Sequence, residues 1–341
     1  MIMNPSTDLL KRPMRDLRIS VTDRCNFRCR YCMPKEIFGD DYAFMHSSEL
    51  LSFDEIERLV QLFVGLGVRK VRLTGGEPLL RRGLPQLIGR MAAIAGVEDI
   101  GLTTNGLLLG AQAQPLYDAG LRRLNISLDS LHPRRFGYMN GRGIKPEQIL
   151  KRIDYAQSIG YTIKMNMVVQ KGLNDVDIVP MADYFRKRGI TLRFIEFMDV
   201  GNDNGWKHQY VVPEQAILQQ LRTRYTLEPV DPDHYGEVAR YYRYAGTNTE
   251  VGFISSVSDS FCSSCTRARL SSEGKLYTCL FANEGYDLRS LMRRGADDTF
   301  LLQAIKRVWE HRLDRYSDER SDADPTEQTY PSKINMSYIG G

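Results

Sequence analysis

Residues 17–34 read LRISVTDRCNFRCRYCMP, a short strand-like run that leads directly into three cysteines. In this run Arg18 and Ser20 share one face of an extended chain, while Ile19 and Val21 share the opposite face. Parallel strands that are buried on both faces usually read as nearly continuous apolar runs, and this one does not. Since the apolar face should pack under helices, the sequence predicts that the polar face lines an interior.

Five further strand-like runs follow before residue 199, and helical segments separate several of them. The runs are KVRLT (70–74), DIGLTT (99–104), RLNISLD (123–129), IKMNMVV (163–169) and LRFIEFM (192–198). Ser52 and Glu55 form a capping-box pattern in front of an amphipathic segment. Residues 146–160 begin with proline and end with glycine, as a helix should. Strands that alternate with helices indicate βα units and a parallel sheet.

The polar alternation of the first run recurs in three of the others. The inward positions would be Arg72, Thr74, Asn125, Ser127, Asp129, Lys164 and Asn166. Edge strands with one wet face are the alternative, and repetition over four strands weighs against it. We therefore predict an α/β fold with a partial (βα)6 barrel of TIM type in residues 1–204, whose lumen holds a large polar ligand. Residues 205–341 would form a C-terminal α+β extension, in which the charged stretch 315–328 is solvated.

The composition is ordinary for a globular protein, with 26% charged and 42% hydrophobic residues and a formal net charge of +4. This charge fits an anionic small molecule as well as nucleic acid and by itself decides nothing. The start of the chain has no apolar core of signal-peptide length, and no stretch reaches the roughly 20 apolar residues that cross a bilayer. We therefore expect a cytoplasmic protein that does not span a membrane.

The six cysteines fall into two groups of three, and the first group follows the first strand directly. Cys25, Cys29 and Cys32 have the spacing C-x3-C-x2-C. Structural disulfides belong mainly to small secreted domains, so metal or redox chemistry is the better interpretation. No histidine lies at ligand spacing, which disfavours a zinc knuckle. Iron–sulfur clusters usually take four cysteines, so three would leave one iron open to a small molecule.

The second group, Cys262, Cys265 and Cys279, has the spacing C-x2-C-x13-C and begins in the stretch DSFCSSCTRARL (259–270). It is either a zinc site that lacks its fourth ligand or a site left open for another molecule. Arg267 and Arg269 would point the same way if the chain is extended there. Arginine can form bidentate hydrogen bonds to a phosphate or a purine edge. For any single arginine, a surface salt bridge is the alternative.

The first cysteine group, with Tyr31 just before its last cysteine, resembles that of the radical S-adenosylmethionine (radical SAM) superfamily. The stretch LTGGEPLL (73–80) is similar to the GGEP motif of that superfamily, which follows the second strand. The resemblance implies a 4Fe–4S cluster on Cys25, Cys29 and Cys32, whose open iron chelates SAM. It also implies reductive cleavage of SAM to a 5′-deoxyadenosyl radical that abstracts a hydrogen atom.

The second cysteine group and the terminal Gly340-Gly341 resemble those of the GTP 3′,8-cyclases of molybdenum-cofactor biosynthesis, over nearly the whole chain. This resemblance implies a second 4Fe–4S cluster on Cys262, Cys265 and Cys279, whose open iron binds the guanine of GTP. The radical would abstract the ribose 3′ hydrogen, and the carbon radical would attack guanine C8 to give 3′,8-cyclo-7,8-dihydro-GTP. The enzyme would be a lyase that performs the first step of molybdopterin biosynthesis.

The same resemblance implies roles for individual residues. The GTP contacts would be Arg18, Arg72, Thr103, Lys164, Arg267, Ala268 and Arg269. The SAM contacts would be Tyr31, Gly76, Ser127 and Met198. The catalytic residues would be Arg18, Arg267, Arg269, Gly340 and Gly341. Without the resemblance, the glycine tail would be interpreted as a flexible terminus.

The partners that the resemblance implies are GTP, a low-potential electron donor of flavodoxin or ferredoxin type, and cyclic pyranopterin monophosphate synthase as the next enzyme. It implies neither nucleic acid nor a membrane, and it is compatible with a homodimer. Two rival interpretations stay open. A radical SAM peptide or protein maturase also carries auxiliary clusters, usually with more cysteines than these. A ferredoxin-like carrier or a zinc-stabilised binding module would require fully ligated metal sites, and two sites with three cysteines each argue against both.

Overall fold

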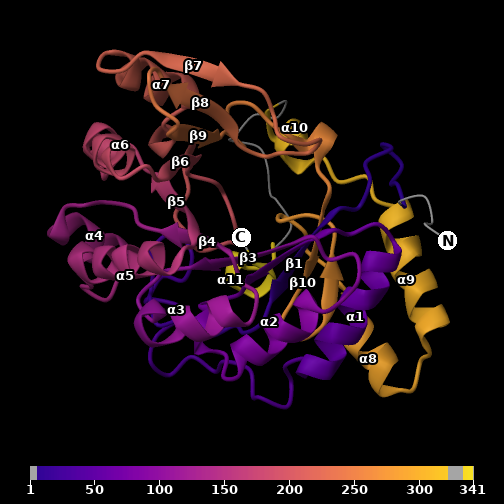
Figure 1. Cartoon of the computed structure of the whole chain (residues 1–341). Helices are drawn as coiled ribbons and strands as arrows, with labels where there is room; N and C mark the ends of the chain where they lie inside the picture. Colours follow the sequence, from indigo (N-terminus) through magenta and orange to yellow (C-terminus); the bar gives the residue numbers. More distant parts are fainter. Residues whose placement is uncertain (1–5, 322–332, 341) are drawn as a thin grey trace.

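A single curved sheet organises the protein, for which the computed structural model describes residues 6–321 and 333–340. Within these ranges twelve strands form the sheet in the order β12-β11-β10-β1-β2-β3-β4-β5-β6-β9-β8-β7 (Figure 1). The described residues form no helix that is long and apolar enough to cross a membrane.

The middle of the sheet consists of the six strands that the sequence predicts. They are β1 (Asp16–Ser20), β2 (Lys70–Thr74), β3 (Asp99–Thr104), β4 (Arg123–Ser127), β5 (Thr162–Val169) and β6 (Thr191–Glu196). Each pairs in parallel with the next. In β5 the alternation is regular, because Met165 and Met167 are fully buried while Lys164 and Asn166 are only half-buried.

Helices follow these strands and cover the outer face of the sheet (Figure 1). They are α1 (Phe53–Gly65), α2 (Leu84–Ala92), α3 (Leu109–Asp118), α4 (Pro133–Met139), α5 (Pro146–Ile159) and α6 (Ile178–Lys187). The capping box predicted at Ser52 and Glu55 is confirmed, with both reciprocal hydrogen bonds present. Gly160 ends α5 in the left-handed region, at φ 109°, where a residue with a Cβ would be strained. The predicted α/β partial barrel is therefore confirmed.

The C-terminal third extends both edges of this sheet. Its elements are α7 (Glu214–Arg222), β7 (Leu227–Val230), β8 (Arg240–Tyr244), β9 (Glu250–Ile254), β10 (Arg267–Leu270), β11 (Lys275–Tyr277), β12 (Tyr286–Asp287), α8 (Leu288–Arg293), α9 (Asp298–Glu310), α10 (Tyr316–Ser321) and α11 (Met336–Ile339). Strand β10 pairs in parallel with β1, and β9 pairs in parallel with β6. Both edges of the six-strand section, which would otherwise expose unpaired backbone groups, are thereby covered.

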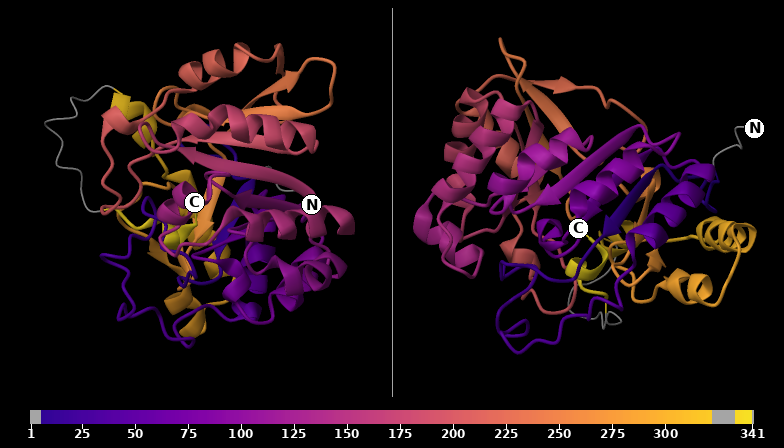
Figure 2. Two further views of the ribbon diagram at one scale, coloured as in Figure 1. Left: turned by 90° about the vertical axis from the view of Figure 1, so that its left-hand side faces the viewer. Right: turned by 60° about the horizontal axis from the view of Figure 1, so that its bottom comes forward.

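The last described residues turn inward. Helix α11 contacts β1 and lies near the centre of the molecule in Figure 1, and Figure 2 shows the same arrangement from two other directions. The prediction of a solvated stretch is wrong for Tyr316 and Arg320 of α10, which both bond to the buried Asp199, while Arg315 and Glu319 are exposed as predicted. Charge alone did not reveal this partner, which is distant in the sequence. Residues 322–328 of that stretch lie outside the described residues.

Candidate active site

A cavity of about 320 Å³ lies at the centre of the molecule, and both cysteine groups line it. The inward faces of β1 to β6 and β10 form one side, and the loops that carry the cysteines form the other. Most of the residues that the sequence analysis singled out line this cavity. They are Arg18, Cys25, Cys29, Tyr31, Cys32, Arg72, Gly76, Thr103, Ser127, Lys164, Met198, Cys262, Cys265, Arg267, Arg269 and Cys279.

Three of the predicted site residues are placed differently. Ala268 is fully buried in the hydrophobic core on the outer face of β10, so its side chain cannot contact a ligand in the cavity. Gly340 lies just beyond α11, where its carbonyl oxygen accepts a hydrogen bond from Arg269. Gly341 lies outside the described residues.

The first cysteine group (Cys25, Cys29 and Cys32) sits on a loop that packs against the GGEP turn. The amide of Gly76 donates to the carbonyl of Thr22 at 2.8 Å, and that of Glu77 donates to Arg24 at 2.8 Å. A Cβ at Gly76 would come within 2.3 Å of the Arg24 carbonyl oxygen. The glycines are therefore required first for the close approach of two backbone segments, rather than only for the approach of a ligand.

Burial and nearby carboxyl groups dominate the electrostatics of this first group. Burial raises the pKa of Cys25 to about 12, and the charge of Glu77 adds to the effect. The pKa of Cys29 is raised well above its usual value by burial and then by Cys25 and Asp129. Burial likewise raises the pKa of Glu77 to about 7 and that of Asp129 to about 6. Burial thus favours the neutral forms of these thiols and carboxyl groups unless a positive charge lies beside them.

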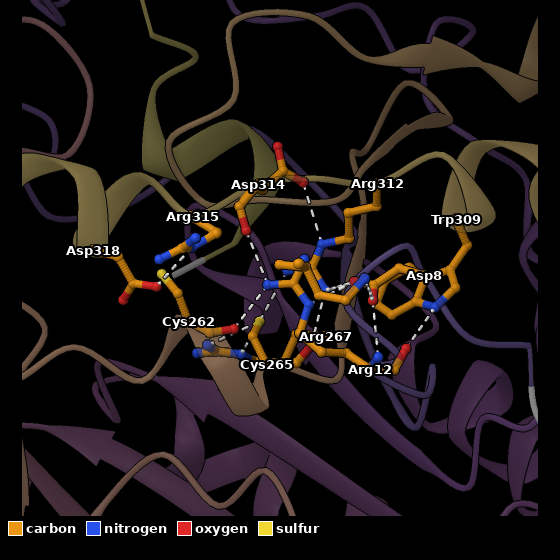
Figure 3. Close-up of polar contacts among 11 residues, drawn as sticks. Asp8, Arg12, Cys262, Cys265, Arg267, Trp309, Arg312, Asp314, Arg315 and Asp318 are labelled. Atoms are coloured by element: carbon orange, nitrogen blue, oxygen red, sulfur yellow. Dashed lines mark hydrogen bonds and ion pairs between the residues drawn. The ribbon is translucent and has the colours of Figure 1, made fainter.

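In the second cysteine group (Cys262, Cys265 and Cys279), burial and then Asp314 raise the pKa of Cys279 to about 11, whereas Cys265 has the opposite surroundings. Burial alone would raise the pKa of Cys265, but Arg267 and Arg312 outweigh it and lower that pKa to about 6. Arg267 donates to the Cys265 sulfur from Nε at 3.3 Å and from Nη2 at 3.1 Å. Arg312 donates to the same sulfur from Nη2 at 3.2 Å. Figure 3 shows this convergence of two guanidinium groups on one thiol.

Three arginines stand side by side on the cavity floor. In the parallel register Arg18 of β1 lies between Arg269 of β10 and Arg72 of β2. Like charges in directly opposed positions destabilise a sheet. Burial, followed by Arg72 and Arg269, holds the pKa of Arg18 well below its usual range. The buried Nε atoms of Arg18 and Arg72 have no hydrogen-bond partner among the described residues. The row is therefore arranged for an anion.

Sequence reasoning missed two cavity residues of the same character. Arg193 lines the cavity, where it donates to Asn166 at 2.9 Å and to Asn125 at 2.6 Å. The strand alternation through Leu192 and Phe194 could have identified it. Arg312 also lines the cavity, but it follows α9 in a segment with no strand or helix periodicity. No sequence signal marks it.

The geometry of both cysteine groups differs from that of a single-ion site. Within residues 6–321 and 333–340, no three His, Cys, Asp or Glu side chains are close enough to hold one metal ion. A cluster takes each thiolate on a different iron, so its ligands stand farther apart than those of a single ion. Donors that commonly accompany ligating sulfurs are present, since the amides of Phe27 and Phe281 donate to Cys25 and Cys279 at 3.4 and 3.5 Å.

Two family models match the chain in succession. Residues 19–185 match the radical SAM superfamily, and residues 190–318 match Molybdenum Cofactor Synthesis C. Among solved structures, the chain is similar to Streptococcus suis SuiB bound to S-adenosylmethionine. The TM-score is 0.59 at 17% identity, over 88% of this chain and 68% of that one. This likeness concerns the fold alone. The fold and the three-cysteine loop thus define a radical SAM protein, a class that implies a 4Fe–4S cluster and SAM.

Curated relatives narrow the class. The chain is 56% identical to the GTP 3′,8-cyclase of Staphylococcus saprophyticus and 56% identical to that of Staphylococcus carnosus, in each case over 98% of both chains. It is 54% identical to the GTP 3′,8-cyclase of Staphylococcus aureus strain Newman, again over 98% of both. The chain therefore belongs to the GTP 3′,8-cyclase family of molybdenum-cofactor biosynthesis.

Proposed function

We propose that this enzyme converts GTP to 3′,8-cyclo-7,8-dihydro-GTP, as a lyase that performs the first step of molybdopterin biosynthesis. The observation that carries the proposal is the row Arg269-Arg18-Arg72, which faces a cavity that both cysteine groups line. Family membership supplies the reaction class, and the row supplies the reason for an anionic substrate.

In this proposal Cys25, Cys29 and Cys32 hold a 4Fe–4S cluster, and the cavity wall beside them binds SAM. When bound, the cluster supplies the electron that cleaves SAM and so provides the hydrogen-abstracting radical. SAM carries a sulfonium and an ammonium charge, which suit the buried carboxyl groups of Glu77 and Asp129. Tyr31 donates to Asp129 at 2.9 Å and orients it. Gly76, Ser127 and Met198 complete the proposed SAM contacts.

Cys262, Cys265 and Cys279 would hold a second 4Fe–4S cluster, at which the guanine of GTP binds. Arg18, Arg72, Lys164, Arg267 and Arg269 would neutralise the triphosphate and hold the ribose in place, with Thr103 beside them. Guanidinium groups that a protein fixes in advance bind phosphate with little further loss of side-chain entropy. Ala268 would contribute only through its backbone, since its side chain packs in the core.

Glycines of the tail would take part in catalysis beside the arginines. The carbonyl of Gly340 accepts a hydrogen bond from Arg269, which brings the tail to the row Arg269-Arg18-Arg72, called the anion row below. A Cβ at Gly340 would come within 2.0 Å of Cγ2 of Thr74, so only glycine fits. For Gly341, which lies outside the described residues, we propose the catalytic role that the resemblance implies.

The remaining partners belong to the same proposal. They are a flavodoxin or ferredoxin as electron donor, cyclic pyranopterin monophosphate synthase as the next enzyme, and a second copy of the chain as a homodimer. All six cysteines are free, which suits a cytoplasmic location. We propose that residue 204 separates two functional parts of the chain. Residues 1–204 carry the first cysteine group and residues 205–341 carry the second, while both parts contribute strands to one sheet.

Anaerobic reconstitution followed by iron and sulfide analysis tests the cofactor content, and incubation with SAM, a reductant and GTP tests the reaction. We expect about eight irons per chain and release of 5′-deoxyadenosine that depends on GTP. Omission of GTP, or its replacement by ATP, is the matched control. Bound zinc, or cleavage of SAM that is indifferent to GTP, would contradict the proposal.

A further inference from the structure

Two buried arginines outside the anion row hold the loop that carries Cys262 and Cys265 (Figure 3). The first is Arg12, whose side chain is fully buried. Its Nη1 donates to the carbonyl oxygen of Cys262 at 2.8 Å and to that of Asp314 at 2.9 Å. The N-terminal segment thereby fixes the backbone at one end of the loop.

The second is Arg312, which fixes the other end of the same loop. Its Nη1 donates to the carbonyl oxygen of Cys265 at 2.8 Å, and its Nη2 donates to the Cys265 sulfur at 3.2 Å. The guanidinium lies 4.7 Å from the centre of the Trp309 ring. One planar group therefore fixes the backbone and the side-chain sulfur of the same residue through two nitrogens held in a fixed geometry, whereas the three donors of a lysine share one nitrogen and lack this geometry.

One carboxylate orients both arginines. Asp8, whose side chain is fully buried, accepts from Arg12 Nε at 2.6 Å and from Arg312 Nη1 at 3.5 Å, both at Oδ2. The indole nitrogen of Trp309 in turn donates to the Arg12 carbonyl at 3.2 Å. Three segments that lie far apart in the sequence therefore meet behind the loop. A buried network of this kind is costly unless its partners are fixed, so the loop is held in one arrangement.

Within the described ranges, the hydrogen bonds from side-chain cations to the sulfur atoms of this cysteine group all go to Cys265. The Cys265 sulfur lies between Arg312 on one side and Arg267 on the other. The Cys279 sulfur accepts only a backbone amide, from Phe281 at 3.5 Å. The three thiols of the group are therefore unequal before any cluster is bound.

We infer that Arg312, oriented by Asp314 at 3.2 Å and by Asp8 at 3.5 Å, is a positioning residue for the second cluster: it fixes the sulfur of Cys265 and raises the reduction potential of that cluster. The inference rests on the proposed binding of a cluster by Cys262, Cys265 and Cys279. A reduced cluster carries one more negative charge than the oxidised one. Hydrogen bonds and positive charge at a ligating sulfur therefore stabilise the reduced form.

The test measures the second cluster alone, in the full chain with Cys25, Cys29 and Cys32 all replaced by alanine. In this background Arg312→Gln removes the charge and the paired donors, while Arg312→Lys keeps the charge and loses the pairing. After anaerobic reconstitution, a redox titration monitored by EPR gives the potential. We expect a shift to more negative potential in Arg312→Gln and a smaller shift in the same direction in Arg312→Lys.

Arg315→Gln is the matched control. Arg315 lies three residues further on, is half exposed and pairs with Asp318 at 3.1 Å, without contact to a cysteine. We expect its potential to equal that of the background protein. Unchanged potentials in both Arg312 variants, or an equal shift in the Arg315 variant, would overturn the inference.

Iron content and the melting temperature of the cluster-free chain separate the remaining outcomes. If Arg312→Gln binds no cluster while its melting temperature equals that of Arg315→Gln, positioning is supported. If iron and melting temperature fall together in both Arg312 variants, the role is general stability and the inference fails. If the background protein itself binds no cluster, the proposed second cluster is wrong, and this result is distinct from the failure of the Arg312 inference.

Discussion

The two cysteine groups each contain three thiols, yet arginines outweigh burial at one thiol of the second group, Cys265, while the pKa of Cys279 is raised like those of the first group. Near the first group, burial and the carboxyl groups of Glu77 and Asp129 raise the pKa of the thiols. Near the second, Arg267 and Arg312 lower the pKa of Cys265 to about 6 despite its burial. The cysteine spacing thus indicates the kind of cofactor, and the neighbouring charges indicate the kind of guest. The first site suits cationic SAM, and the second suits an anionic nucleotide.

Removal of one ligand from each group should break this comparison most completely. In Cys279→Ala we expect loss of the second cluster and of GTP turnover, with iron content falling by about half. SAM binding at the first site should persist, because Cys25, Cys29 and Cys32 lie on a different loop from Cys279. Cys32→Ala is the reciprocal control, which should lose SAM cleavage and keep the second cluster. Iron analysis and GTP binding by the variants give the answer. Intact GTP binding in Cys279→Ala would show that the second site is wrongly assigned.

The C-terminal tail joins the two sites, and a methyl group should displace it. Gly340 has φ 71° and lies against Thr74 of β2 and Arg269 of β10. In Gly340→Ala the new Cβ would overlap Cγ2 of Thr74, so we expect GTP turnover to fall about a hundredfold through misplacement. Steady-state kinetics measure the loss.

A second substitution separates steric overlap from backbone strain. Thr74→Ser removes only the methyl group that Cβ would meet at 2.0 Å. In the Gly340→Ala background, this change should restore part of the lost turnover, because the left-handed backbone of residue 340 still strains alanine. The single variant Thr74→Ser should be nearly as active as the unchanged enzyme. No rescue in the double variant would assign the whole effect to backbone strain.

Sequence reasoning predicted the six central strands, the capped α1 and the glycine-terminated α5, because their signals are local. The polar alternation also predicted that Arg18, Arg72 and Lys164 would share one cavity. It did not predict that β9 and β10 would cover the edges of the sheet, since the residue pattern within a strand does not indicate which distant strand it pairs with.

The site was predictable to the extent that it consists of spaced motifs. All six cysteines that the spacing singled out line one cavity. Arg312 could not be found, because its role depends on Asp8 and Cys265, which lie 304 and 47 residues away. The same holds for Asp199, whose charged partners come from the C-terminal 26 residues of the chain. Buried charge networks between distant segments are read only from the folded chain.

The anion row offers a smaller test, in which affinity and stability should change in opposite directions. In Arg18→Met, GTP should bind about tenfold to a hundredfold more weakly, since a charge-assisted hydrogen bond contributes about 1.5–3 kcal/mol. The nucleotide-free protein should become more stable by about 1 kcal/mol, because a buried cation between two neighbouring cations is gone. GTP titration and urea unfolding measure the two effects.

The control for Arg18→Met is Arg243→Met, which removes a half-exposed arginine that lies 3.6 Å from Glu250. We expect this control to leave GTP affinity unchanged and unfolding within about 0.5 kcal/mol. If Arg18→Met destabilises the nucleotide-free protein, the row is not strained in the absence of an anion, and the contrast between the two cysteine sites loses its main support.

The smallest effect on turnover, within a few-fold, should come from a substitution of Asp199. This residue follows Met198 of the proposed SAM site and bonds to the C-terminal segment near the second site. Lys333 donates to Asp199 Oδ2 at 2.7 Å, and Tyr316 and Arg320 also bond to this carboxylate. Burial would raise the pKa of Asp199, but Arg320 and Lys333 outweigh it and lower that pKa below the usual 3.8. A lowered folded-state pKa contributes stability that is present above pH 3.8 and lost as the pH falls through the folded value.

Asp199→Asn should therefore reduce the free energy of unfolding of the cluster-free chain by about 1–3 kcal/mol at pH 7. The difference from the unchanged protein should shrink as the pH falls below about 4, because the native carboxylate then becomes protonated and neutral. Urea unfolding at a series of pH values measures this convergence, and Asp203→Asn, at an exposed position nearby, should cause no change. A difference that stays constant with pH would mean that Asp199 acts through packing. The link between the two sites would then depend on the shape of this side chain and not on its charge.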